Sequence, residues 1–246
     1  FMELLFWIDA FRRASASSIT VIIPFFSYSK ADKKDEPRVS IRARVCADCI
    51  EAAGAERIIT MDLHSQQIQG FFKIPVDHLY ARPVFCEHIT ALGLKNYVIA
   101  APDAGFTKNA RKFSSILKVP TVIGDKVRVG NDESIEELEI IGEVKGKNVV
   151  IVDDFTTTCS TLARMAAELK KMGAKDIYAF VSHELLREPG LRLLEKSHIK
   201  QLVSTDSVHN PDAAMHPKVK IISVAPMFAE VIKRIHNRES IAPLFE

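Results

Sequence analysis

Three stretches of the chain share one pattern of apolar and polar positions. Each joins a helical segment, through a short connection rich in Ala or Gly, to a strand of β-branched and apolar residues; the stretches span residues 11–25, 50–59 and 169–182. In the first and third, the last helical turn carries a basic pair at the same spacing before the strand. Such αβ units build parallel sheets, so the pattern predicts an α/β fold.

The rest of the chain continues this alternation. Further strands are expected at residues 97–101, 120–124, 149–152, 201–204 and 220–224, and helices at 41–53, 82–92, 108–117, 162–172 and 227–237. Because parallel strands end at one edge of a sheet, the polar turns that follow them are expected to line a crevice. Those turns cover residues 28–35, 62–69, 102–107, 124–137 and 153–161.

A Pro-rich, aromatic connection, IPVDHLYARP, separates two runs of αβ units. We therefore place a domain boundary near Tyr80 and Ala81. The expected domains are residues 1–80 and residues 81–229, with residues 230–246 packing back on the first. The second domain is expected to carry the sugar-phosphate loop described below.

Composition narrows the class of protein. Hydrophobic residues make up 47% of the 246 positions, enough for a sizeable core, and the net charge is only +2, from 33 basic and 31 acidic residues. With no basic block and no run of ~20 apolar residues, we expect neither nucleic-acid nor membrane binding. Cysteines at positions 46, 49, 86 and 159 form no disulfide framework, which favours a cytoplasmic protein. The apolar opening FMELLFWIDAF is interpreted as a helix, and its Phe1 suggests a fragment or a processed product.

Residues 149–162, VVIVDDFTTTCSTL, combine an apolar strand, two adjacent acids, a run of hydroxyl side chains and the start of a helix. Unpaired N–H groups at a helix N-terminus bind phosphate, and carboxylates at a strand's carboxyl end accept hydrogen bonds from sugar hydroxyls or hold a metal. The stretch therefore predicts a phosphorylated-sugar site. It resembles the phosphoribosyl diphosphate-binding motif, although Cys159 and Ser160 stand where that motif usually has Gly-Gly or Ala-Gly.

A second stretch resembles a family more specifically. TMDLHSQQIQGFFKIPVDHLYA, residues 60–81, closely matches a signature of ribose-phosphate diphosphokinases. Residues 2–38, APDAGFTKNARKF at residues 101–113 and APMFAEVIKRIHNRESIAPLF at residues 225–245 are similar to other segments of the same family. Roughly the family's first 60 residues, about a third of its N-terminal domain, are expected to be absent.

The resemblance implies two tandem phosphoribosyltransferase-like domains with mainly parallel sheets and flanking helices, the first truncated. It also implies a reaction in which the 1-hydroxyl of ribose 5-phosphate attacks the β-phosphorus of ATP, giving phosphoribosyl diphosphate and AMP. The partners would be ATP and ribose 5-phosphate, the cofactor Mg²⁺, and the assembly a homo-oligomer, commonly a hexamer in the family.

Residue roles follow from the same resemblance. His64 and Asp103 would hold the magnesium of Mg-ATP, and Lys126 and Arg128 would be the catalytic cations of a flexible loop at residues 125–137. Lys30, Ala31 and Asp32 would join His64 in binding ATP, although the family usually has Arg-Gln-Asp in place of these three residues. Ribose 5-phosphate would be bound by Asp153, Asp154, Thr157, Thr158, Cys159, Ser160 and Thr161.

Two other functions stay open at this point. A non-catalytic regulatory subunit or degenerate homologue would fit Ala31 and the Cys159–Ser160 pair, which depart from the family pattern. A phosphoribosyltransferase would share the sugar-phosphate loop, but it would have one domain and a base-binding hood in place of tandem domains. Formation of AMP from Mg-ATP and ribose 5-phosphate would distinguish the diphosphokinase from the non-catalytic homologue.

Overall fold

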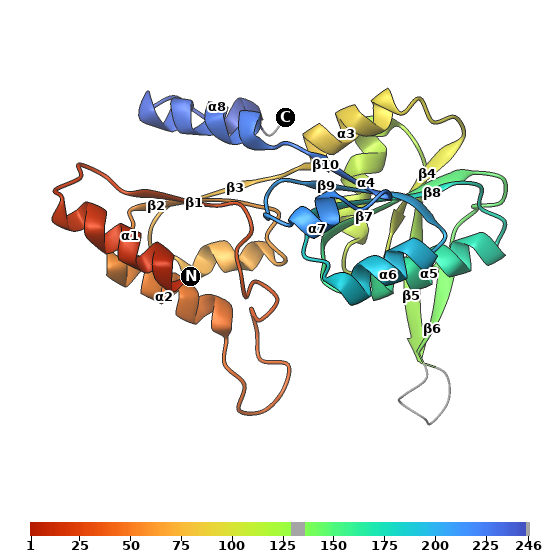
Figure 1. Ribbon diagram of the computed structural model, residues 1–246, viewed down its shortest axis with the longest axis horizontal. Helices are drawn as coiled ribbons and strands as arrows, with labels where there is room; N and C mark the ends of the chain where they lie inside the picture. The colour runs from red at the N-terminus through yellow and green to blue at the C-terminus, as the bar shows by residue number, and fades with distance from the viewer. Residues whose placement is uncertain (129–135, 245–246) are drawn as a thin grey trace. The chain divides into compact units, whose positions relative to one another are not determined.

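The chain forms two compact units in the computed structural model, which describes residues 1–128 and 136–244 (Figure 1). One unit comprises Phe1–Tyr80 with Ala242–Glu246, and the other Ala81–Ile241. The division lies in the Pro-rich connection. Residues 230–241, which we expected to pack with the first domain, are grouped with the second unit.

The first unit has a three-stranded parallel sheet in the order β1-β2-β3. Its core joins Ile8 of α1 and Ile50 of α2 to Ile58 of β2, so both helices pack against the sheet. In Figure 1, α1 and α2 lie on the same face of the strands. The elements are α1 (Met2–Arg13), β1 (Thr20–Ile23), α2 (Arg42–Ala53), β2 (Arg57–Met61), the 3₁₀ helix η1 (Gln66–Phe71) and β3 (Val76–Leu79).

The second unit is built on a seven-stranded sheet in the order β10-β9-β8-β7-β4-β5-β6, parallel except for the antiparallel pair β5 and β6. Its strands are β4 (Tyr97–Ala101), β5 (Thr121–Arg128), β6 (Glu136–Ile141), β7 (Asn148–Thr156), β8 (Ile177–Glu184), β9 (Ile199–Thr205) and β10 (Val219–Ile222). Its helices are α3 (Arg82–Ala91), α4 (Thr107–Leu117), α5 (Ser160–Lys171), α6 (Glu188–Lys196), α7 (Pro211–Ala214) and α8 (Ala225–His236). The 3₁₀ helix η2 (Ala242–Leu244) that follows α8 is grouped with the first unit.

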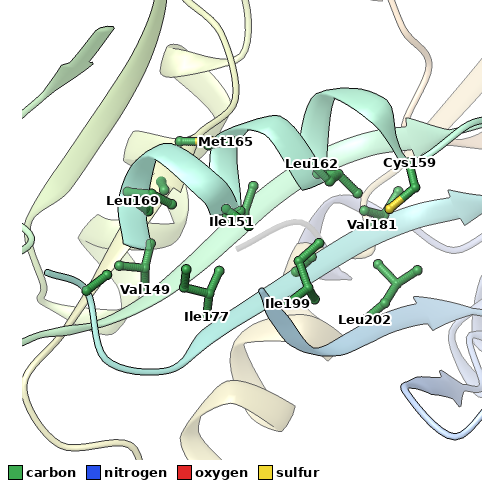
Figure 2. Close-up of a cluster of buried hydrophobic side chains, with 14 of the residues drawn as sticks. Val149, Ile151, Cys159, Leu162, Met165, Leu169, Ile177, Val181, Ile199 and Leu202 are labelled. Carbon is green, nitrogen blue, oxygen red and sulfur yellow. The ribbon is translucent and has the colours of Figure 1, made fainter. Parts of the chain in front are cut away.

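A buried apolar cluster fixes α5 against the sheet of the second unit (Figure 2). The helix contributes side chains at helical spacing, and the strands contribute alternate positions of their inward face. The labelled members are Val149, Ile151, Cys159, Leu162, Met165, Leu169, Ile177, Val181, Ile199 and Leu202. This packing sets the position of the turn that joins β7 to α5.

The α/β class and the mainly parallel sheets with flanking helices are confirmed. Three local expectations differ. Residues 76–79 form β3 within the expected connection, the expected loop at residues 125–137 begins and ends in the strands β5 and β6, and α6 was not expected. Pro189 and Gly190 read as helix breakers, but Pro is compatible with the first helical turn, where it stands in α6. Among the described residues, no helix has the length and apolar character needed to cross a membrane.

Candidate active site

Three carboxylates gather at the carboxyl ends of β4 and β7. These strands are parallel neighbours, with Ala100 opposite Ile151, so Asp103 after β4 and the pair Asp153 and Asp154 at the end of β7 share one sheet edge. Their proximity has an electrostatic consequence. The pKa of Asp153 is held well above its usual range, first by burial, then by the Asp154 carboxylate and more weakly by Asp103.

The acid pair is also organised by hydrogen bonds. Asp153 Oδ1 accepts the N–H of Asp154 at 2.9 Å, and Asp154 Oδ1 accepts the N–H of Phe155 at 2.8 Å. A hydrogen bond between the two carboxyl groups further raises the pKa of Asp153. Two close carboxyl groups that share a proton titrate as a pair, and a cation or a set of donating hydroxyls would favour their charged form.

The turn after the acid pair presents hydroxyl groups to solvent. Thr157, Thr158, Ser160 and Thr161 are exposed, and the hydroxyls of Thr158 and Ser160 lie 3.0 Å apart. The helix α5 begins at Ser160, so its first N–H groups face the same turn. Exposed hydroxyls together with a helix N-terminus suit a phosphate group.

Cys159 shows why this turn usually contains glycine. Its φ of +64° lies in the left-handed region, where a residue with a Cβ costs on the order of 1–2 kcal/mol. The thiol is only 1% exposed within the buried cluster, and burial raises its pKa to about 11, so it is a neutral packing group. Ser160 lies in the helix without a positive φ, so the expected restriction applies to Cys159 alone.

Hydrogen bonds from neighbouring buried groups support this turn. The N–H of Cys159 donates to Thr156 Oγ1 at 3.2 Å, and the N–H of Leu185 donates to the Thr156 carbonyl at 2.9 Å. Glu184, 2% exposed, accepts from the Leu186 N–H and from the side-chain amide of Asn210. These bonds tie the end of β8 to the start of the turn at residues 157–161, named the sugar-phosphate turn after its expected ligand.

Helix α6 approaches the same turn closely. A Cβ built on Gly190 would lie 2.9 Å from Leu186 Cδ2 and 3.4 Å from both the carbonyl carbon and oxygen of Thr158. Only a residue without a side chain fits at this distance unless its neighbours move. Residues 184–190 therefore buttress the turn, a role that the sequence pattern did not indicate.

Lys126 and Arg128 belong to β5, where their backbones pair with Leu138 and Glu136 of β6. The pairing of β5 with β4 ends at Ile123, so this hairpin continues beyond the carboxyl end of β4, at the edge that carries Asp103. Their roles stay a prediction, and the middle of the expected loop lies outside the described residues.

The remaining expected residues lie on the first unit. Lys30, Ala31 and Asp32 follow β1, and His64 follows β2, its parallel neighbour, so all four lie at the carboxyl edge of that sheet. His64 and Lys30 are exposed, whereas Ala31 and Asp32 are partly buried. Each unit thus carries one part of the expected residue set: the first unit the four residues named here, the second unit the acids, the hydroxyl turn and the two cations.

A magnesium ion would need oxygen ligands from these side chains. Among the described residues, no group of three or more His, Cys, Asp or Glu side chains could hold a metal ion by itself. Mg²⁺ in nucleotide sites is commonly held by one or two carboxylates together with substrate phosphates. The three acids at one edge, where burial and then the neighbouring carboxylates raise the pKa of Asp153, provide the negative charge that such a site needs. The residues present therefore fit a magnesium ion that arrives with a nucleotide.

Comparisons with known proteins identify the family of the chain. A family model described as the N-terminal domain of ribose phosphate pyrophosphokinase matches residues 1–54, and one described as a phosphoribosyl synthetase-associated domain matches residues 130–246. The ribose-phosphate pyrophosphokinase of Porphyromonas gingivalis is 46% identical over 99% of this chain and 77% of its own length. That of Helicobacter hepaticus is 44% identical over 99% and 78%.

A solved structure gives the same result for the fold. The crystal structure of phosphoribosylpyrophosphate synthetase from Mycobacterium smegmatis aligns with a TM-score of 0.90 and 34% identity, over 96% of this chain and 78% of the other. Sequence identity and fold thus agree over nearly the whole chain. On this basis, the chain belongs to the ribose-phosphate pyrophosphokinase family.

Proposed function

We propose that the protein transfers the β,γ-diphosphoryl group of ATP to the 1-hydroxyl of ribose 5-phosphate, giving phosphoribosyl diphosphate and AMP. The carrying observation is the β7–α5 turn, where a largely buried acid pair leads into exposed hydroxyls and a helix N-terminus. The 46% identity to a curated ribose-phosphate pyrophosphokinase supports this reaction.

In this proposal, the second unit binds the sugar phosphate. Asp153 and Asp154 accept hydrogen bonds from ribose hydroxyls, and the 5-phosphate is held by the turn and the first N–H groups of α5. The residues of the turn are Thr157, Thr158, Cys159, Ser160 and Thr161. Cys159 contributes its backbone, because its thiol is buried in the core.

The nucleotide is assigned to Lys30, Ala31, Asp32 and His64. Lys30 supplies a positive charge for phosphate, whereas Ala31 can contribute only backbone groups. His64 and Asp103 would hold the magnesium ion of Mg-ATP; the ion supplies charge neutralisation at the phosphates. Lys126 and Arg128 would stabilise the charge that develops on the transferred group. By family likeness, we further propose a cytoplasmic homo-oligomer.

The test is direct. Purified protein incubated with Mg-ATP and ribose 5-phosphate should form AMP and phosphoribosyl diphosphate in equal amounts, measured by anion-exchange chromatography. Omission of ribose 5-phosphate is the control, because ATP hydrolysis would also release product nucleotide. Folded protein that binds ribose 5-phosphate but forms no AMP would favour the alternative, a non-catalytic homologue.

Gly190→Ala should weaken ribose 5-phosphate binding. The new Cβ meets the end of the Leu186 side chain and touches the Thr158 backbone, so the buried Leu186 side chain must move or α6 and the sugar-phosphate turn must separate. We expect KM for ribose 5-phosphate to rise by a few-fold, KM for ATP to stay unchanged, and the free energy of unfolding to fall by about 1–3 kcal/mol. Steady-state kinetics and thermal unfolding measure these effects.

Gly70→Ala is the matched control for that variant, because a Cβ there meets no heavy atom within 4 Å. It should change neither stability nor KM for ribose 5-phosphate appreciably. If Gly190→Ala destabilises the protein but leaves KM for ribose 5-phosphate at the native value, α6 does not position the turn.

A further inference from the structure

His78 is a buried imidazole whose hydrogen bond reaches the segment that carries His64. It lies on β3 with 7% of its surface exposed, and its Nε2 accepts the N–H of Leu63 at 2.9 Å. The ring also contacts Tyr80, with ring centroids 4.6 Å apart. All of these residues belong to the first unit.

The hydrogen bond fixes the chemical form of the ring. A ring nitrogen that accepts a hydrogen bond carries no hydrogen, so the hydrogen of the neutral imidazole resides on Nδ1. Nδ1 lies 3.4 Å from the side-chain amide of Gln69. The same Gln69 nitrogen donates to the Gln66 carbonyl at 3.0 Å, so the side chain of Gln69 is held beside the ring.

The segment that His78 holds has an unusual backbone. Asp62 has a φ of +41°, so the chain leaves β2 in a conformation that residues with a Cβ rarely adopt. Two bonds to β3 stabilise the departure: the Asp62 N–H donates to the Leu79 carbonyl at 3.0 Å, and the Leu63 N–H donates to His78. The second bond depends on a side chain, and it acts on the residue next to His64.

We propose that His78 is a positioning residue, which holds the Leu63 N–H and thereby sets the direction in which His64 leaves β2 toward the nucleotide. This inference rests on the proposed role of His64 in binding Mg-ATP. Loss of the acceptor would leave a buried N–H unsatisfied, which is costly, and the segment would relax to bring that N–H to water. The effect should fall on nucleotide binding and spare the sugar phosphate.

Two substitutions separate the hydrogen bond from packing. In His78→Gln, the side-chain oxygen reaches the place of Nε2 and accepts the Leu63 N–H, whereas His78→Met fills a similar volume without a strong acceptor. Leu79→Met is the matched control. It alters packing at the next position of β3, but leaves in place the hydrogen bonds from the Asp62 N–H to the Leu79 carbonyl and from the Leu63 N–H to His78.

Titration calorimetry with Mg-ATP is the first measurement. We expect the Kd of His78→Met to rise about tenfold, and those of His78→Gln and Leu79→Met to stay within about threefold of the native value. The Kd for ribose 5-phosphate should be unchanged in all three. Equal weakening by His78→Met and His78→Gln, or a parallel loss of ribose 5-phosphate binding, would overturn the proposal.

Hydrogen exchange of the Leu63 amide is the second measurement, and it needs no ligand. Protection should be lost in His78→Met and kept in His78→Gln and Leu79→Met. If the native protein and His64→Ala bind Mg-ATP equally, the assignment of His64 fails, and the positioning role fails with it. If protection follows the expected order but AMP is never formed, the catalytic proposal fails while the positioning of residues 62–64 stands.

Discussion

Replacement of Lys126 by alanine is expected to lower kcat by about 10²–10³-fold with little change in folding. In diphosphoryl transfer, most catalysis comes from groups that stabilise the charge of the transition state, and loss of one such group typically costs a factor of this size. Lys126 lies in β5, and its backbone pairs with Leu138 whatever its side chain. Because a transition-state interaction is removed, kcat and kcat/KM should fall together.

The measurement is AMP formation under saturating Mg-ATP and ribose 5-phosphate, with thermal unfolding as a check on the fold. Lys196→Ala is the control, because it removes an exposed lysine of the same unit at the end of α6 and should change neither quantity appreciably. A native kcat in Lys126→Ala would exclude a catalytic role for this lysine. A rise in KM alone would assign it to substrate binding.

The acid pair and the helix behind it could be predicted because their signals are local. A β-branched run meets Asp153 and Asp154 directly, and apolar residues recur after them at helical spacing, as at Leu162, Met165 and Leu169. The same side chains form the buried cluster of Figure 2. The strand, the acid pair, the hydroxyl-rich turn and the helix are therefore encoded within residues 149–169.

The β5–β6 hairpin was missed because its strands carry no clear apolar alternation. Residues 125–137 are mostly polar, and strands that extend beyond the main sheet need no buried apolar face, so no alternation indicates them. Residues 76–79 raise the same problem, since they form a strand only by pairing with β2. For both segments, strand pairing and not the pattern of the segment itself decides the structure.

His78 and Glu184 show the same limit for side chains. His78 acts on a backbone N–H fifteen positions away, and Glu184 is joined to Asn210 across twenty-six positions. The residue types alone favour neither a structural nor a functional role. Glu184 did have a weak sequence signal, because it ends a buried strand at the same sheet edge as Asp153. It was missed because that strand was expected to end at residue 182.

Asp153→Asn is expected to abolish most activity and to stabilise the unliganded protein at neutral pH. Asn keeps the shape of the side chain but replaces one carboxylate oxygen with an N–H donor, so it loses the negative charge and cannot accept a ribose hydroxyl at that position. Each lost charge-assisted hydrogen bond costs about 1.5–3 kcal/mol, which predicts a fall in kcat/KM for ribose 5-phosphate of about 10²-fold. AMP formation at varied ribose 5-phosphate measures this fall.

Asp153→Asn is expected to raise stability while it lowers activity, because the native pKa of Asp153 is raised by burial and by Asp154. A carboxyl group with a raised folded pKa contributes its stability below the unfolded pKa and loses it as the pH rises through the folded pKa. Asn has no carboxyl group to ionise, so the variant does not lose this stability as the pH rises. The gain in Tm of Asp153→Asn over the native protein should therefore be near zero at about pH 4 and grow toward about pH 8.

Thermal unfolding of the unliganded protein across this pH range checks the sign, and about 1 kcal/mol corresponds to roughly 2–4 °C in a chain of this size. Asp176→Asn is the control, because it removes an exposed acid that pairs with Lys200 on the surface, where ion pairs contribute little. A lower Tm for Asp153→Asn at neutral pH would mean that the native site favours the charged carboxylate even without ligand. A gain in Tm that grows with pH, together with lost activity, would show that the acid pair destabilises the protein until substrate or cation binds. Binding energy would then be needed to keep both carboxylates charged.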